Sequence, residues 1–464
     1  MKGTDNMWHD MNGNMAGGHS RDDYTRIQEA AGLHCEGLTE EDIAIIMDLE
    51  KHRVHALLEQ GMSLGYYHYQ PVYTLPKLGS ELHHTLLHER VTHDLSYALE
   101  NTLHLRSNHV RVTWSPPAMF EHYREQPANH GAIDETYRQA ETQSLQNVAR
   151  IAGRYLARRL FDDSAHTIGL NYGTSVMFTV KEIPILPSRI TRKLTIVSLF
   201  GDLGYYLAPQ PLHKDGYAPC NEIVSLLADK IGEPPLVRKE LLSVPVFIPH
   251  TFATSKDTFL KIRSFLTQHA SYEKIFGHEN GDDSSPLFDK IDTIITGVGS
   301  VDNYTSLSRF LPLWLSEQES EKLLEYCREG KIAGDLGGHF IPDPAYATGS
   351  HDVARFLDRI NQRLIAASPD RFKEVAERYA YNPHSGAGVV CAAAGARKAK
   401  ILFALLNEPS CPLSCLFIDS HCALALLYLI DEEKYTRLIS SDNRLFAGAK
   451  RWSEETKALI PVPH

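Results

Sequence analysis

The stretch Thr167-Ile-Gly-Leu-Asn-Tyr-Gly-Thr-Ser175 sets the pattern for most of this chain. It begins with an apolar run typical of a buried strand and ends with a glycine and two hydroxyl residues that open a helix. Such a helix start directs backbone N–H groups and hydroxyls at one anion. Gly173, Thr174 and Ser175 are therefore candidate phosphate ligands. The alternative is an ordinary helix cap, because these residue types are also common there.

The alternation of apolar strands and helices continues to the C-terminus. Strands are predicted at 110–113, 167–170, 194–199, 244–248, 291–296, 388–393 and 415–418. Helices are predicted at 148–160, 221–231, 256–269, 396–406 and 421–430. Continuous apolar strands separated by helices indicate a parallel sheet covered on both faces. The predicted fold class is α/β, with a Rossmann-like, mostly parallel sheet whose ligands bind beyond the carboxyl ends of the strands.

Two glycine-containing loops follow predicted strands of this sheet. They are Phe200-Gly-Asp-Leu-Gly204 and Gly297-Val-Gly-Ser-Val-Asp302. Glycine lets the backbone approach a ligand closely, which makes Gly201 a candidate ligand contact. Asp302 is a candidate acceptor for sugar hydroxyl groups. The alternative interpretation of Asp302 is a turn residue.

Two further glycine-rich segments carry charged side chains. Lys398 ends Ala394-Gly-Ala-Arg-Lys398, at the first turn of a predicted helix. A cation gains nothing from the helix dipole at that end, so Lys398 is expected to hold an anion unless it is simply solvated. Asp335 lies in Gly330-Lys-Ile-Ala-Gly-Asp-Leu-Gly-Gly338, where it either orients the loop or contacts the ligand.

Composition limits the possible classes of protein. With 464 residues, 43% of them hydrophobic, the chain is too long for one ordinary domain. The sequence contains no apolar run of about 18 residues, so no membrane span is expected. Residues 1–23 lack the apolar centre of a signal peptide and are expected to be disordered. The seven cysteines are expected to be reduced thiols of a cytoplasmic protein.

A two-helix pattern precedes the sheet, within the run Gly37–Leu58. Thr39 is a candidate N-cap of the first helix and a candidate DNA contact. The second helix would direct Lys51, His52, Arg53 and His55 outward, as a helix reading a DNA major groove does. The net charge of −11 requires any DNA contact to be local. The alternative is a small helical bundle that serves only dimer contacts.

The segments between these regions are less informative. Leucines recur through 78–103 and predict a linker or oligomerisation helix over 75–105. His84 and His88 have the i, i+4 spacing of metal ligands, but a solvated helix face explains them better and no metal site is predicted. The polar segment 118–145 is predicted to be an insertion, partly helical and exposed.

Taken together, the chain resembles the SorC family of sugar-responsive transcriptional regulators. The resemblance rests on the helix-turn-helix run and on motifs that follow it in the same order: Ile168-Gly-Leu-Asn-Tyr-Gly-Thr-Ser175, Phe200-Gly-Asp-Leu-Gly204, Thr296-Gly-Val-Gly299, Gly334-Asp-Leu-Gly-Gly338, Ala394-Gly-Ala-Arg-Lys398 and Ile418-Asp-Ser-His-Cys-Ala423. It implies a winged helix-turn-helix over 24–74 and an effector domain over 106–464 related to phosphosugar isomerases and deaminases. It also implies dimers or tetramers, operator DNA as partner, and a phosphorylated sugar held by Gly173, Thr174, Ser175 and Lys398.

The chain departs from this family in its second short helix. Asp48 replaces a small turn residue, Glu50 and Lys51 replace a serine and an arginine, and Ala56 replaces a further arginine. Fewer cations weaken the expected hold on DNA. A sugar-binding oligomer with a degenerate DNA-binding domain is therefore one alternative to a ligand-controlled DNA-binding regulator.

The other alternative is a sugar-phosphate isomerase or deaminase. The related deaminases carry an Asp-Gly-His motif after their Gly-x-Gly loop, where this chain has Ser300-Val-Asp-Asn-Tyr304. The missing histidine argues against catalysis. No catalytic residue and no cofactor are therefore predicted.

Overall fold

The computed structural model describes residues 26–27, 30–31, 40–47, 49–63, 95–99, 109–113, 115, 119, 135–161, 165–184, 193–202, 219–232, 236–253, 255–277, 285–300, 311–347 and 352–441. The chain divides into two compact units, Met1–Leu86 and Leu87–His464. The division falls inside the predicted linker 75–105, most of which lies outside the described residues. The predicted tail 1–23, the predicted wing and the histidine pair His84 and His88 lie outside them as well.

The first unit contains two helices, α2 (Glu40–Met47) and α3 (Lys51–Ser63). Ile43 of α2 and Val54 and Leu58 of α3 are buried against each other and against Ala30 and Ala31. The backbone N–H of Leu49 donates to Ala44 O at 2.9 Å, which turns the chain from one helix toward the next. The predicted pair of short helices is confirmed.

The second unit is built on a sheet of seven strands. In spatial order these are β1 (His109–Thr113), β10 (Cys415–Asp419), β9 (Gly388–Ala393), β5 (Thr293–Thr296), β2 (Thr167–Leu170), β3 (Leu194–Ser198) and β4 (Val237–Glu240). Every neighbouring pair is parallel. The predicted α/β class with a parallel sheet is confirmed.

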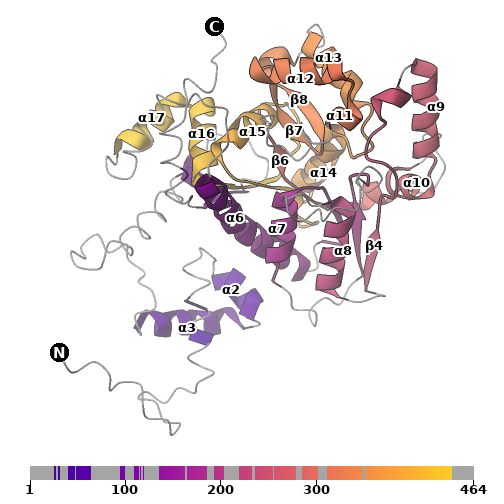
Figure 1. The fold of residues 1–464 in the computed structure, drawn as a ribbon. Helices are drawn as coiled ribbons and strands as arrows, with labels where there is room; N and C mark the ends of the chain where they lie inside the picture. Colours follow the sequence, from indigo (N-terminus) through magenta and orange to yellow (C-terminus); the bar gives the residue numbers. More distant parts are fainter. Residues whose placement is uncertain are drawn as a thin grey trace. The chain divides into compact units, whose positions relative to one another are not determined.

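Helices cover both faces of this sheet (Figure 1). On one face lie α6 (Glu135–Phe161), α7 (Thr174–Glu182) and α8 (Cys220–Ile231). On the other lie α14 (Pro369–Tyr381) and α16 (Ser420–Ile430), with α15 (Ala399–Leu406) packed on α16. Successive residues of a strand point to opposite faces, so Ile295 joins one core and Ile294 the other. This two-sided burial explains the continuous apolar strands of the sequence.

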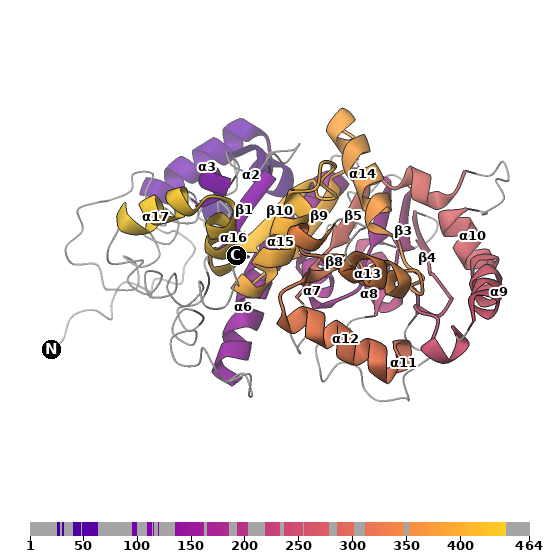
Figure 2. The ribbon, with the colours of Figure 1, turned by 90° about the horizontal axis from the view of Figure 1, so that it is seen from above.

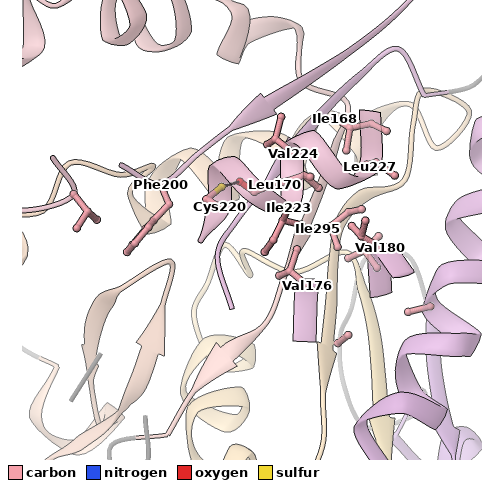
Figure 3. Packing of buried hydrophobic residues seen from close by; sticks show 14 of the residues in the cluster. Ile168, Leu170, Val176, Val180, Phe200, Cys220, Ile223, Val224, Leu227 and Ile295 are labelled. Atoms are coloured by element: carbon pink, nitrogen blue, oxygen red, sulfur yellow. Dashed lines mark hydrogen bonds between the residues drawn. The ribbon is translucent and has the colours of Figure 1, made fainter. Parts of the chain in front are cut away.

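The core beneath α7 and α8 is drawn in Figure 3. Side chains of both helices meet those of β2 and β5; the labelled residues are Val176, Val180, Ile223, Val224, Leu227, Ile168, Leu170 and Ile295. Burying a side chain of this kind stabilises the fold by about 1.5–3 kcal/mol. The packing fixes the position of α7, whose first turn follows directly from β2.

A second, antiparallel sheet of three strands was not predicted. It consists of β6 (Val298–Gly299), β7 (Ile332–Leu336) and β8 (His339–Pro342). Beside it lie α11 (Leu311–Trp314), α12 (Glu317–Arg328) and α13 (Asp352–Asn361) (Figure 2). Its glycine-rich strand β7 lacks the apolar alternation that usually marks a strand.

The remaining helices lie outside the sheet layers. They are α9 (Lys256–Thr267), α10 (Ala270–Phe276) and α17 (Glu432–Ser441), and the short 3₁₀ helices are η3 (His250–Phe252), η4 (Leu287–Lys290), η5 (Pro344–Tyr346) and η6 (Ala396–Lys398). Among the described residues, no helix combines the length and the apolar character that a membrane crossing needs.

The strand predicted at 244–248 is wrong. The segment is buried, but it forms only isolated bridges, Asp202 with Pro245 and Phe247 with Leu364. Proline cannot donate to a strand ladder, so Pro245 limits pairing here. The strand that follows β3 is instead β4, whose exposed Arg238 and Lys239 mask it in the sequence. It is an edge strand in the sheet, and charged side chains suit that position.

The segment 118–145 is partly helical, as predicted, but the predicted exposure is wrong for part of its second half. α6 is one continuous helix from Glu135 to Phe161, not a helix that begins near 148. Ala140 is 5% exposed and Ser144 is fully buried, so this part of the segment belongs to the core of the unit. The polar sequence concealed the burial because Ser144 is buried through a hydrogen bond to Asp419.

Candidate functional site

The carboxyl ends of the parallel strands lie at one edge of the large sheet. From β2 the chain proceeds outward to β3 and β4, then returns to the other side of β2 to form β5 and later β9. The loops after β2 and β5 therefore diverge at a topological switch point. Crevices at such points are where ligands bind in open α/β sheets.

The loop after β2 opens helix α7. Gly173 has a φ of 109°, which favours glycine, and a Cβ at this position would meet no atom within 4 Å. The open space above Gly173 leaves the first turn of α7 accessible. At the far end of α7, Lys230 donates to the carbonyl oxygens of Val180 at 3.1 Å and Ile183 at 2.7 Å. This contact anchors the C-terminus of the helix to α8 and so fixes the direction of its first turn.

The loop after β5 lies directly against α7. A Cβ on Gly297 would come within 3.0 Å of the Cβ of Ser175. The chain then forms β6, where Gly299 pairs with Asp335 of β7. A Cβ on Gly299 would overlap the Asp335 carboxylate, so only glycine permits this approach. The predicted residues Ser175 and Asp335 are thus joined by the short segment 297–299.

Asp335 is a buried carboxylate with three electrostatic partners. Burial raises the pKa of Asp335, and the Tyr172 hydroxyl, Lys398 and the Gly338 amide oppose that rise. The Tyr172 hydroxyl donates to Oδ1 at 2.8 Å and the Gly338 N–H donates to the same oxygen at 3.2 Å. Asp335 is 3% exposed, so its carboxylate is held rigidly in place.

Lys398 reaches the same segment from the loop after β9. Its Nζ lies 3.5 Å from the hydroxyl oxygen of Ser300, the residue that follows β6. Segment 297–300 therefore contacts Ser175 at one end and Lys398 at the other. The first turn of α7, Asp335 and Lys398 therefore lie around segment 297–300, although the sequence separates them widely.

The loop that carries Lys398 is fastened to α6 and β10. The Gly395 N–H donates to Asp419 Oδ1 at 3.0 Å, and the Ser144 hydroxyl donates to Oδ2 at 2.6 Å. The Arg397 guanidinium donates to both oxygens of Glu141, at 2.7 and 2.9 Å. The sequence analysis did not predict these hydrogen bonds. The one local indication of them was an acidic residue, Asp419, at the end of an apolar strand.

Tyr172 and Asn171 were also missed. The Tyr172 ring stacks on Phe200 with centroids 4.1 Å apart, and its hydroxyl holds Asp335. The Asn171 side chain donates to the Thr296 hydroxyl at 3.1 Å and so ties the ends of β2 and β5 together. The sequence feature that could have indicated them is a pair of polar residues directly after an apolar strand.

Two other residues were predicted to contact the ligand, Gly201 and Asp302. The Gly201 N–H already donates to Ile365 O at 3.0 Å, and a Cβ there would clash with the backbone of Val246. Packing therefore explains why position 201 is a glycine, and the proposed ligand contacts do not include Gly201. Asp302 lies outside the described residues.

The DNA-binding candidates lie on α3 of the first unit. Lys51, His52, Arg53 and His55 are all exposed, as predicted, and Thr39 lies outside the described residues. His52 Nδ1 lies 3.1 Å from Glu50 Oε2. His55 Nδ1 lies 2.9 Å from Glu40 Oε1 of α2, and its Nε2 lies 3.4 Å from Glu59 Oε1. Acidic residues thus accompany the histidines of this face.

The described residues include no cluster of metal ligands, and their most deeply buried thiols are unreactive. No three His, Cys, Asp or Glu side chains within it are grouped closely enough to hold a metal. The six cysteines in that part are free, and burial raises the pKa of Cys220 to about 11 and that of Cys391 to about 12. Buried thiols of this kind are poor nucleophiles.

No family model and no curated protein matches the chain. Among solved structures it is similar to a DeoR family transcriptional regulator from Listeria monocytogenes, with 18% identity and a TM-score of 0.47 over 72% of this chain and 99% of that one. It is also similar to the full-length sorbitol operon regulator SorC from Klebsiella pneumoniae, with 13% identity and a TM-score of 0.43 over 88% of this chain and 100% of that one.

A third similar structure is a domain of a possible sugar-binding transcriptional regulator from Arthrobacter aurescens TC1. Its identity is 18% and its TM-score 0.44, over 72% of this chain and 97% of that one. All three descriptions name transcriptional regulators, the class that the resemblance in the sequence also names.

Proposed function

We propose that this chain is a DNA-binding transcriptional regulator whose affinity for an operator is set by a small phosphorylated sugar. The structural neighbours bear descriptions of this class, but the support comes from the residues of this chain. The single observation that carries the proposal is that the first turn of α7, Asp335 and Lys398 meet through segment 297–300 at the switch point. The space that they border is the proposed ligand crevice.

Each side of this crevice suits one part of such a ligand. Gly173, Thr174 and Ser175 offer a helix N-terminus, which favours a phosphate, and Lys398 supplies a cation. Asp335 offers carboxylate oxygens, which accept hydrogen bonds from sugar hydroxyl groups. Asp302 remains a proposed sugar contact on the basis of the sequence alone.

Helix α3 provides the proposed DNA contact. Lys51 and Arg53 are exposed near its N-terminal end, the part of a recognition helix that meets base edges and phosphates. Thr39, His52 and His55 complete the proposed set. A dimer or tetramer would place two copies of α3 about one DNA turn apart on a palindromic operator. The ligand would then act by binding one state of the oligomer more tightly than the other.

Ligand binding to the full-length chain tests the crevice. We expect calorimetry to detect a hexose or pentose phosphate, with weaker binding of the unphosphorylated sugar. The variant Lys398→Met should weaken the phosphate ester at least about tenfold, because a charge-assisted hydrogen bond is lost. Lys373→Met on α14 is the matched control, since Lys373 is partly buried but pairs with Glu408 away from the crevice.

The outcomes separate the possible functions. Equal binding of the phosphorylated and unphosphorylated sugars would show that the crevice does not select an anion. Conversion of the sugar phosphate in the same mixture would favour an isomerase or deaminase. Fluorescence anisotropy with the DNA upstream of the gene, with and without the sugar phosphate, then tests the regulator. Undetectable DNA binding at low salt would favour a sugar-binding oligomer with a degenerate DNA-binding domain.

A further inference from the structure

Two histidines lie among the charged side chains described on α2 and α3, so the charge there depends on pH. Among the side chains described there, the cations are Lys51 and Arg53, and the carboxylates are Glu40, Glu50 and Glu59. His52 and His55 complete the set. With both histidines protonated, this set of described side chains carries two more positive charges than with both histidines neutral. DNA, which is a polyanion, distinguishes these two states.

His55 occupies a special place on this face because both of its ring nitrogens face carboxylates. Nδ1 lies 2.9 Å from Glu40 Oε1 on α2, and Nε2 lies 3.4 Å from Glu59 Oε1 one turn further along α3. A neutral imidazole has one N–H donor, whereas the imidazolium has two. Only the protonated ring can therefore serve both carboxylates at once.

We propose that protonated His55 is a positioning residue that ties α2 to α3, and that its deprotonation weakens DNA binding as the pH rises through neutrality. The inference rests on the proposed function, and it assigns His55 a different role from the base contact expected from the sequence. The contact joins α2 and α3 of the first unit. Its loss therefore changes both the packing of the two helices and their charge.

The direction of the effect follows from the chemistry of the site. The hydrogen bond to Glu40, and secondly its charge, raise the pKa of His55 above the ordinary 6.5, with smaller help from Glu59. A group whose pKa is raised by folding stabilises the fold fully below its ordinary pKa, and the effect disappears as the pH passes the raised value. Above that value the face also loses one positive charge, so DNA binding weakens further.

DNA affinity across pH tests the proposal in the full-length chain. At constant ionic strength we expect the wild-type protein to bind operator DNA roughly threefold to tenfold more tightly at pH 6 than at pH 8. His55→Gln should flatten much of this profile, because a neutral amide cannot gain a charge. His55→Arg should restore tight binding at both pH values, since a guanidinium offers permanent donors to both carboxylates.

His384→Gln is the matched control, because His384 is an exposed histidine of the other unit and should leave the pH profile unchanged. A proton NMR titration of the His55 ring gives a readout that needs no DNA. In the Glu40→Gln variant the pKa of His55 should fall toward the ordinary value for histidine.

The outcomes distinguish this inference from the proposed function. If His55→Gln weakens binding equally at every pH, His55 has a merely structural role and the inference is wrong. If the wild-type and Glu40→Gln proteins titrate alike at His55, the contact with Glu40 has no electrostatic effect and the inference is also wrong. If the wild-type protein binds no DNA at any pH, the proposed function fails and the inference fails with it.

Discussion

The two units of this protein place charged groups in opposite environments. At the start of α3 the charges are solvated; the side chains of His52 and of Glu50, just before the helix, are 74% and 80% exposed. At the carboxyl edge of the large sheet the charges are buried; Asp335 is 3% exposed and Asp419 is fully buried. Solvated charges contribute little to folding and are free to meet a partner, whereas buried charges must be satisfied within the fold. The contrast therefore separates charges that are free to meet a partner from charges that the fold itself satisfies.

The largest expected effect concerns the buried ion pair between Arg363 and Glu319. Arg363 is 7% exposed and donates to both Glu319 oxygens, at 2.9 and 2.7 Å. Arg363→Met should lower the free energy of unfolding of the large unit by about 3 kcal/mol, because Glu319 loses both guanidinium donors and keeps the Ser316 cap and Arg359, whose Nε lies 3.9 Å away. Urea denaturation monitored by circular dichroism measures this loss. A loss below about 1 kcal/mol would break the contrast between buried and exposed charges.

The next effect concerns acid. Burial lowers the pKa of His339 from 6.5 to about 4. The unfolded chain therefore binds the proton first, and the folded state loses stability as the pH falls from 6.5 toward 4. Over this pH range the free energy of unfolding should fall by about 3 kcal/mol because of His339 alone. His421, with a pKa lowered to about 3, acts with the same sign.

Unfolding measured from pH 7 to pH 4 should show a shallower acid limb in His339→Gln than in the wild-type protein. The exposed His384 supplies the control, since His384→Gln should leave the limb as it is. An unchanged limb in His339→Gln would mean that the buried ring does not resist protonation.

A smaller effect is expected where glycine permits the approach of segment 297–299 to Asp335. Gly299→Ala would place a Cβ 1.5 Å from Asp335 Oδ2, and the displacement should cost about 1–3 kcal/mol and disturb ligand binding. Gly232→Ala provides the matched control, because its Cβ would meet only Val237, at 3.7 Å. Denaturation and calorimetry of both variants check this; equal stability would show that the contact can relax without cost.

The smallest effect on folding is expected on α3. Arg53 is exposed, so Arg53→Gln should change the stability of the fold by less than about 0.5 kcal/mol. The same change should weaken DNA binding and lower the salt slope by about one unit, because one phosphate contact is lost. Anisotropy at several salt concentrations measures the slope. If Arg53→Gln loses stability but keeps its DNA affinity, Arg53 supports the fold and does not bind DNA.

The sequence was sufficient wherever local pattern reflects burial. Apolar runs predicted β2 and β9 with correct bounds, and the two-helix pattern predicted α2 and α3. The glycine and hydroxyl residues after β2 predicted the open first turn of α7. These features depend on residues close together in the chain, so their signals are local.

Only the tertiary structure decided what depends on distant residues. Asp335 and Lys398 meet because β6 pairs with β7 and passes beside η6, and β6 is too short to leave a pattern in the sequence. Ser144 and Glu141 looked like parts of an exposed insertion, yet they hold Asp419 and Arg397 across the sheet edge. A polar residue is compatible with either solvent or a buried partner, and only the partner's position determines which one it has.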